Sequence, residues 1–375
     1  MEKTILMINV HEDDVLCFRK EVILGLADSG YKVVLLYPLG NRQNELTHEN
    51  IEHVDISMDR HGYNIFKDGA LLIRYFRAIK KYDPFVVLLY TIKPNVYGSI
   101  ASRLAGKPYI NNITGIGSTL YGDDGSLLSK FIIFLYKIAL KKSSHVFFQN
   151  SFNSAYFLGR NICDKNRSSI IPGSGVDLNR FKYEEYPVRD NFVFNYIGRV
   201  MKKKGVLDYV KAAQIIKGKH SNCEFNILGF VEDDETELKK IIKDAQDNGA
   251  VIYRGNQPDI QPWIAQSDAI ILPSKYGEGI SNVLLETAAT GRGLITTTIP
   301  GCKDVVENNN GFLFEPGDVD GLVNCVERFM SLSTEERINM GKRSREHVEK
   351  NFSRQVVVNE YEKLVNKVFE NGEIH

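Results

Sequence analysis

Short apolar runs rich in valine, isoleucine and leucine alternate with helical patterns along almost the entire chain, and this alternation constrains the fold most. In the first half the runs are TILMINV, YKVVLLYPL, FVVLLYT, YINNITG, HVFFQN and SSIIPGSGV, which begin at residues 4, 31, 85, 109, 145 and 168. Apolar runs separated by helices are typical of a parallel sheet with helices on both faces. The first half therefore predicts an α/β domain.

The same rhythm restarts after the charged stretch RFKYEEYPVRDN at residues 180–191. Six further runs follow, namely FVFNYIGRV, CEFNILGFV, AVIYRGN, AIILPS, GLITTTI and GFLFE. A chain of 375 residues is long enough for two domains. We predict two Rossmann-like domains, over 1–178 and 179–354, and a helix over about 355–375. Ligands of such sheets bind at the carboxyl ends of the strands, so the site is expected in a cleft between the domains.

Composition excludes several classes of protein. Hydrophobic residues make up 43% of the chain and charged residues 25%, as in soluble globular proteins. Lysines interrupt the apolar stretches before the ~20 residues that a membrane-spanning helix requires. The start, MEKTILMINV, lacks the regions of a signal peptide, so we expect a cytoplasmic protein. The five cysteines form no Cys-x-x-Cys pair, which argues against zinc and against disulfides.

Two acids bracket the start of a predicted helix in YGEGISNVLLETAATG. Ser281 or Asn282 is the expected N-cap, and Gly291 follows the helix. The exposed N–H groups of a helix start can hold a phosphate. Glu278 would then lie beside a sugar on that phosphate, and Glu286 would accept both hydroxyls of a ribose. The alternative is a solvated Glu278 and a Glu286 that pairs with a surface cation.

Two cations follow another predicted strand in FNYIGRVMKKKGVLDYV. The strand ends at Gly198, and Arg199 and Lys204 precede the next helix. Paired Arg and Lys can neutralise the charge of a departing nucleoside diphosphate without a metal. The adjacent Lys202 and Lys203 support the alternative of a solvated basic loop.

The two motifs together, strand-Gly-Arg-x4-Lys-Gly and strand-Pro-Ser-x3-Glu-Gly-x-Ser-Asn-x2-Leu-Glu, resemble those of the retaining glycosyltransferases of family four. The resemblance covers essentially the whole chain, including IIPGSGVDLNRF, GFLFEPGDVDGLV and the C-terminal helix. It implies the GT-B fold, in which two Rossmann-like domains face each other across a cleft and the C-terminal helix crosses back to the first domain. It also implies a UDP-sugar donor, no metal and no cofactor.

The resemblance implies roles for individual residues. Arg199, Lys204 and Glu278 would form the catalytic set, with the two cations on the donor diphosphate and Glu278 facing the transferred sugar. The loop at 257–260 would flank the base. The donor-binding residues would be Gly198, Gln257, Asp259, Ile260, Ser274, Gly279, Ile280, Ser281, Asn282 and Glu286.

The first half resembles, more narrowly, capsule, O-antigen and protein-glycan enzymes that extend sugars on a polyprenyl diphosphate. The segment that carries this resemblance is YTIKPNVYGSIASRLAGKPYINNITGIGSTL. A lipid-linked saccharide is therefore the expected acceptor. Its candidate contacts are His11, Asp13, Lys93, Asn95 and Thr114.

Three features of the acceptor side leave alternatives open. Lys93 would meet the acceptor's phosphate or cap a strand end. The first strand–loop lacks the glycine pair of many family members, and Thr114 stands where many have a histidine. The loop with His11 and Asp13 also fits an exposed acidic turn.

Other functions fit the sequence less well. A dehydrogenase would carry Gly-x-Gly-x-x-Gly after the first strand, where this chain has VHEDDV. The single Asp-x-Asp, at Asp318 and Asp320, fits a helix N-cap and gives no metal site. No nucleic-acid partner is expected. A non-catalytic nucleotide-sugar-binding protein and a GT-B epimerase remain alternatives.

A basic amphipathic segment at 125–145 suggests a second partner. It combines leucines, isoleucines and phenylalanines with Lys130, Lys137, Lys141 and Lys142. Such helices can lie on anionic membranes, which would make the protein peripheral on the inner face of the cytoplasmic membrane. Residues 1–175 carry 21 Lys and Arg against 16 Asp and Glu, in keeping with that idea. The alternative is a helix that covers its own sheet.

Overall fold

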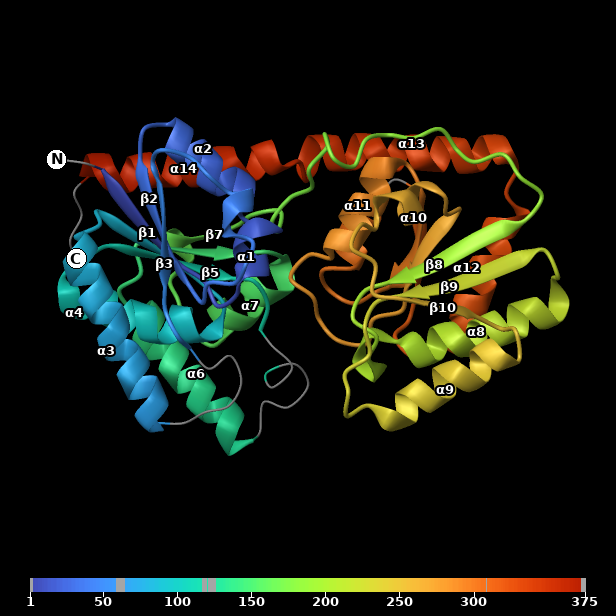
Figure 1. Cartoon of the computed structure of the whole chain (residues 1–375), viewed down its shortest axis with the longest axis horizontal. Coiled ribbons are helices and arrows are strands. Elements are labelled where there is room, and N and C mark those ends of the chain that lie inside the picture. The colour runs from blue at the N-terminus through green and yellow to red at the C-terminus, as the bar shows by residue number, and fades with distance from the viewer. Residues whose placement is uncertain (1–2, 59–64, 117–119, 121–125, 308, 372–375) are drawn as a thin grey trace. The chain divides into compact units, whose positions relative to one another are not determined.

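The computed structural model of the chain describes residues 3–58, 65–116, 120, 126–307 and 309–371 (Figure 1). It divides into two compact units, residues 1–175 with 354–375 and residues 176–353. The predicted boundaries lie at 178–179 and 354–355. The C-terminal helix α14 (Arg354–Asn371) is part of the first unit, although the second unit precedes it in the chain.

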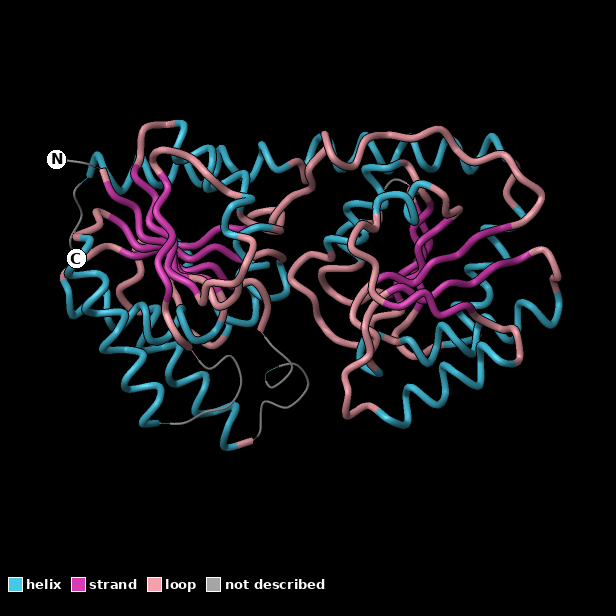
Figure 2. Tube along the Cα trace, in the orientation of Figure 1, coloured by secondary structure: helices cyan, strands magenta, loops and turns pink. Residues whose placement is uncertain are grey.

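The first unit contains a seven-stranded parallel sheet in the order β3-β2-β1-β4-β5-β6-β7 (Figure 2). Its strands are β1 (Thr4–Ile8), β2 (Lys32–Tyr37), β3 (Ile51–Asp55), β4 (Val86–Tyr90), β5 (Tyr109–Ile113), β6 (His145–Phe148) and β7 (Ser168–Ile170). The edge strand β3 is absent from the sequence-based prediction. Its sequence, IEHVD, is polar and only partly buried, so it lacks the apolar run that identifies the inner strands.

Helices cover both faces of this sheet because alternate strand residues point to opposite sides. Val86 and Leu88 of β4 pack in the cluster that includes α2 (Lys20–Asp28) and α14. Val87 and Leu89 pack in the cluster with α3 (Ile65–Tyr82) and α4 (Ser99–Ala105). The remaining elements are α1 (Glu12–Leu16), η1 (Gln43–Glu45), η2 (Pro94–Gly98), α6 (Leu127–Leu140), α7 (Ser151–Gly159) and η3 (Lys165–Arg167).

The second unit contains a six-stranded parallel sheet in the order β10-β9-β8-β11-β12-β13. Its strands are β8 (Phe192–Ile197), β9 (Cys223–Leu228), β10 (Ile252–Gly255), β11 (Ala269–Leu272), β12 (Gly293–Thr297) and β13 (Gly311–Phe314), and each lies in a predicted run. Its helices are η4 (Lys202–Lys204), α8 (Val206–Lys219), α9 (Thr236–Asp247), α10 (Gln261–Ala265), α11 (Asn282–Thr290), η5 (Lys303–Val305), α12 (Val319–Ser331) and α13 (Thr334–Asn351).

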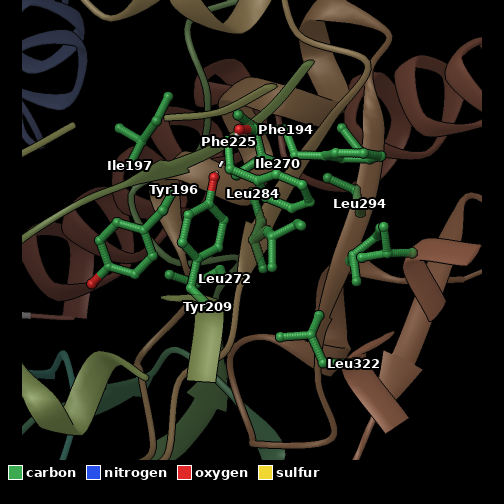
Figure 3. Close-up of a cluster of buried hydrophobic side chains, with 14 of the residues drawn as sticks. Phe194, Tyr196, Ile197, Tyr209, Phe225, Ile270, Leu272, Leu284, Leu294 and Leu322 are labelled. Carbon is green, nitrogen blue, oxygen red and sulfur yellow. Dashed lines mark hydrogen bonds between the residues drawn. The ribbon is translucent and has the colours of Figure 1, made fainter. Parts of the chain in front are cut away.

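Aromatic and aliphatic side chains from β8, β9 and α8 fill the core of the second unit (Figure 3). The hydroxyl of Tyr209 is fully buried there, 2.7 Å from the carbonyl oxygen of Phe194 and 2.9 Å from that of Asn226. This polar group is therefore satisfied inside an apolar cluster. The packing fixes β8, whose carboxyl end carries the predicted cations.

Each sheet has one point where the strand order reverses, between β1 and β4 and between β8 and β11. Loops that leave two such neighbouring strands diverge and open a crevice at the carboxyl edge, where α/β sheets bind ligands. The prediction of two Rossmann-like domains is confirmed, and the fold places the motif loops after β8 and β11 side by side.

Other features of the described residues bear on membrane spans, disulfides, the Asp318 cap and metal sites. None of the described helices combines the length and hydropathy needed to cross a membrane. All five cysteines are free thiols. Asp318 caps α12 by accepting a hydrogen bond from the Gly321 N–H at 2.9 Å, as predicted. Within the described ranges no group of histidine, cysteine and acidic residues could hold a metal ion.

Candidate active site

The loops after β8 and β11 pack directly against each other. Gly205 ends η4 with φ +76°, and a Cβ there would lie 1.8 Å from the Pro273 carbonyl oxygen. The Lys275 N–H also donates a hydrogen bond of 2.9 Å to the Lys203 carbonyl. Only glycine fits at 205, both for its left-handed backbone and for this close approach. The final glycine of the Gly-Arg-x4-Lys-Gly motif therefore joins the two loops.

Lys204 and Glu278 form an ion pair at this junction, between Nζ and Oε1. Their side chains are only 15% and 14% exposed. Ser274, which is fully buried, donates a hydrogen bond of 3.2 Å to the same Glu278 oxygen. The pair thus has a fixed geometry, unlike the exposed ion pairs of a solvated loop.

The electrostatics of the pair keep Lys204 charged. Burial alone would lower the pKa of the Lys204 ammonium, but the charges of Glu278 and Tyr276 and the hydrogen bond to Glu278 raise it above its usual value. The ammonium also lies 5.6 Å from the centre of the Tyr276 ring. An ammonium has three N–H donors, so Lys204 can bind Glu278 and a phosphate oxygen together.

A second turn holds the backbone of the Glu278 loop. The Glu278 N–H donates to the Pro300 carbonyl at 3.1 Å, and the Ser281 N–H donates to the Gly301 carbonyl at 2.9 Å. A Cβ at Gly301 would lie 2.5 Å from the Gly279 carbonyl oxygen. These contacts between the Glu278 loop and the turn at 300–301 are absent from the sequence-based prediction. The Pro-Gly pair after the strand at 293–297 is the turn signal that marks it.

The start of α11 is the predicted phosphate seat. Ser281 is the N-cap, with no side-chain capping hydrogen bond in the described structure, and Gly291 ends the helix with φ +79°. The N–H groups of a helix's first turn suit an anion. Ile280 and Ser281 are buried, whereas Asn282 and Glu286 are partly exposed.

Arg199 adds a second cation at the end of β8. Its carbonyl accepts a hydrogen bond of 2.8 Å from the buried Tyr196 hydroxyl, which fixes the backbone after Gly198. The side chain is exposed, and the described part of the chain provides no hydrogen bond or ion pair to its guanidinium. The guanidinium is therefore available to a ligand at this edge.

The predicted base-flanking residues follow β10, two strands from β8 and hence about 10 Å away across the sheet. Gln257 donates a hydrogen bond of 2.6 Å to the Arg254 carbonyl. Asp259 pairs with Arg180 at 3.1 Å, and Ile260 packs on the core. The side chains of Gln257, Asp259 and Ile260 thus contact other residues of the second unit.

Three acceptor candidates follow β1 and β5, namely His11, Asp13 and Thr114, and their surroundings differ. His11 caps α1 by accepting a hydrogen bond of 3.1 Å from the Asp13 N–H. Asp13 pairs with Arg42 at 2.8 Å, and both side chains of that pair are about half exposed. Thr114, directly after β5, is partly exposed. The residues after β1 form the first turn of α1, in which His11 and Asp13 are exposed and Glu12 is buried.

Lys93 and Asn95 have internal partners. Lys93 pairs with Asp68 at 3.0 Å, and these side chains are only 11% and 7% exposed. Asn95 is buried, donates to the Asn112 carbonyl at 2.9 Å and accepts from the Asn111 amide at 3.0 Å. The structure thus gives both side chains a role in holding the first unit together, where the sequence suggested acceptor contacts.

Solved structures share this fold. A glycosyltransferase from Rickettsia africae matches with a TM-score of 0.80 at 21% identity, over 99% of both chains. Anabaena Alr3699/HepE in complex with UDP matches with a TM-score of 0.77 at 17% identity, over 98% of this chain and 100% of that one. At such identities the likeness concerns the fold alone, which is GT-B.

Family models match both units. Residues 191–331 match "Glycosyl transferases group 1", and residues 5–150 match "Glycosyl transferase 4-like". The chain belongs to these glycosyltransferases and is an enzyme of that class, as the motifs predicted.

Curated relatives are similar over most of their length. The capsular polysaccharide biosynthesis glycosyltransferase CapM of Staphylococcus aureus is 25% identical, over 82% of this chain and 83% of its own. The N,N'-diacetylbacillosaminyl-diphospho-undecaprenol alpha-1,3-N-acetylgalactosaminyltransferase of Campylobacter jejuni is 24% identical, over 94% and 96%. An Escherichia coli UDP-Gal:alpha-D-GlcNAc-diphosphoundecaprenol alpha-1,3-galactosyltransferase is 27% identical, over 71% of each chain.

Proposed function

We propose that this glycosyltransferase moves a hexose or an N-acetylhexosamine from a UDP-sugar to a saccharide on polyprenyl diphosphate, with retention and without a metal. The observation that carries the proposal is the largely buried Lys204–Glu278 pair, with side chains only 15% and 14% exposed, beside the start of α11. It combines a diphosphate-binding cation, an acid for the sugar and a phosphate seat at one sheet edge. The names of the relatives from C. jejuni and E. coli support the choice of donor and acceptor.

In the proposed complex the donor diphosphate lies at the first turn of α11, against Arg199 and Lys204. Lys204 keeps its bond to Glu278 and adds one to a phosphate oxygen, so the diphosphate and the acid share one ammonium. Glu286 accepts hydrogen bonds from the ribose hydroxyls. Gln257, Asp259 and Ile260 line the approach of the base.

In the chemical step, the bond between the anomeric carbon and the diphosphate oxygen breaks, and its electron pair goes to that oxygen. The acceptor oxygen bonds to the anomeric carbon on the same face. The acceptor's hydroxyl proton passes to the diphosphate oxygen. The two cations stabilise the charge that develops there, which removes the need for a metal.

Helix α6 supports a membrane role for the first unit. Tyr136, Ala139 and Leu140 are buried against the sheet, whereas Leu127 is 85% and Phe134 56% exposed. The helix therefore has a second apolar face besides the one that covers its sheet. The exposed lysines at 130, 137, 141 and 142 accompany it. We propose that this surface holds the enzyme on the inner face of the cytoplasmic membrane, where a lipid-linked acceptor is available.

An activity screen tests the proposal. UDP-GalNAc, UDP-GlcNAc, UDP-galactose and UDP-glucose are each offered with a short polyprenyl-diphosphate sugar, and the product anomer is determined by NMR. We expect transfer from one of them with retention. An inverted product, or no transfer from any UDP-sugar, would contradict the proposal. Slow UDP-sugar hydrolysis without acceptor would distinguish a transferase from a binding protein.

A further inference from the structure

A cavity of about 170 Å³ lies at the amino-terminal edge of the first unit's sheet. This is the edge opposite to the one where α/β sheets bind their substrates. Its walls come from the turn between α4 and β5, the turn between α6 and β6, η3, and α14, which contributes Leu364, Lys367 and Val368. The cavity lies entirely within the first unit.

Cations dominate the lining of this cavity, which we call the basic cavity. They are Arg103, Lys107, Lys142, Arg167 and Lys367. Among the described residues, Asp83 lies 2.7 Å from Lys107, and Asp164 lies 3.4 Å from Arg167. The cations that line the cavity outnumber these two carboxylates.

The negative ends of two helices offset part of this positive charge. Arg103 donates to the Ile138 carbonyl at 3.2 Å, and Arg167 donates to the carbonyl of the C-cap Lys141 at 3.3 Å. Both thereby bind the carboxyl end of α6. A helix end carries about half a negative charge, so the ends of α4 and α6 together supply about −1. An excess of positive charge therefore remains in the cavity.

The neutral part of the lining is polar and adds no acid. Ser143, Ser144 and Asn166 contribute to it. His145 also lines the cavity, 2.8 Å from the Ser169 hydroxyl through Nε2. Burial and the nearby Lys367 ammonium lower the pKa of His145 to about 4, so its imidazole is neutral at pH 7. The Lys367 ammonium thus adds to the effect of burial on the pKa of His145.

We propose that the basic cavity binds a phosphate or diphosphate group, at a site separate from the catalytic centre. The excess positive charge matches a phosphate, and the serine and asparagine side chains can hydrogen-bond its oxygens. The cavity volume of about 170 Å³ equals the volume of several water molecules, at about 30 Å³ each, so the cavity has room for a diphosphate. Because Lys367 belongs to α14 and Lys142 to the turn before β6, the bound anion ties the C-terminal helix to the sheet.

Isothermal titration calorimetry with sodium diphosphate tests this site, in saturating UDP so that the donor site is occupied. The test variant is Lys142→Glu with Lys367→Glu, since both side chains are exposed and their change leaves the core intact. The matched control is Lys141→Glu with Lys363→Glu, exposed residues of the same two segments that do not line the cavity. We expect the test variant to weaken binding at least tenfold and the control to stay within twofold.

Hydrogen exchange locates the binding event. Diphosphate should protect the amides of 142–145 and 364–368 in the wild type and in the control. The anion can be free or part of a lipid headgroup, and monomeric dioctanoyl phosphatidate in place of diphosphate separates these sources. Binding of either ligand that the test variant loses supports the site. Binding of neither, or equal affinity in test variant and control, overturns it.

Discussion

The Lys204 ammonium and the Glu278 carboxylate, 74 positions apart in the sequence, meet in a partly buried ion pair at the carboxyl edge of the second unit's sheet. In the proposed function, the cation for the diphosphate and the acid for the sugar hold each other in place, which lowers the reorganisation that the reaction requires.

Replacing Lys204 with alanine should lower kcat by ~10²-fold or more, since a preorganised charge stabiliser is lost. It should also lower the melting temperature, because the Glu278 carboxylate, only 14% exposed, loses its cation. Initial rates of UDP-sugar turnover and thermal melts measure both effects. Lys203→Ala is the matched control: it removes an exposed charge one residue away and should change the rate by less than twofold. A near-normal rate for Lys204→Ala would refute the assignment.

Glu278→Gln and Glu286→Gln should fail in different ways. Glu286 is proposed to bind only the ribose, through hydrogen bonds of roughly 1.5–3 kcal/mol each, so its loss should raise the donor KM about tenfold or more. Glu278 is proposed to face the transferred sugar, so its loss should mainly lower kcat. Steady-state kinetics with varied donor test this division. Identical defects in the two variants would contradict it.

Transfer should continue in excess EDTA, because Arg199 and Lys204 are proposed to supply the charge that a divalent ion supplies in other enzymes. Rates with and without EDTA, at fixed ionic strength, should agree within twofold. Loss of activity in EDTA that added Mn²⁺ restores would show that the metal-free mechanism is wrong.

The outer face of α6 should govern membrane binding. Changing Leu127, Phe131 and Phe134 to serine removes exposed apolar surface worth about 1.5–3 kcal/mol per fully inserted side chain. We expect the variant to stay in the supernatant when vesicles with phosphatidylglycerol are sedimented. Val188→Ser with Ile215→Ser, exposed apolar residues of the second unit, should sediment like the wild type. Wild type that never sediments would exclude this surface as a membrane anchor.

His145 should destabilise the protein as the medium becomes acidic. Burial and Lys367 lower its pKa to about 4, whereas an unfolded histidine titrates near 6.5. The unfolded state therefore binds more protons in that window, so stability is complete above about pH 6.5 and falls by about 3 kcal/mol towards pH 4. NMR titration of the imidazole measures the pKa. Lys367→Gln should raise it and Lys363→Gln should not, and titration near 6.5 in the wild type would contradict the prediction.

The sequence predicts most of the fold because buried parallel strands are apolar runs, and it fails at β3, an edge strand whose IEHVD sequence is polar. It also places Ser281 and Gly291 at the ends of α11, since caps have local signatures. The partners of individual side chains are harder to predict from the sequence. Lys93 and Asn95 follow a strand, as substrate contacts do, yet they point to Asp68 and Asn111. Whether a loop residue faces the interior depends on tertiary packing, which spacing does not encode.

Helix α14 has a consequence for how the chain is made. The ribosome synthesises β1 to β7 before α14, so the face of β4 that packs with Tyr361 and Val365 stays uncovered until α14 emerges. The second unit, residues 176–353, is complete by then. The first unit, although its strands are made before those of the second, thus matures after it, and a nascent chain released at residue 353 would expose an apolar surface that chaperones and proteases recognise.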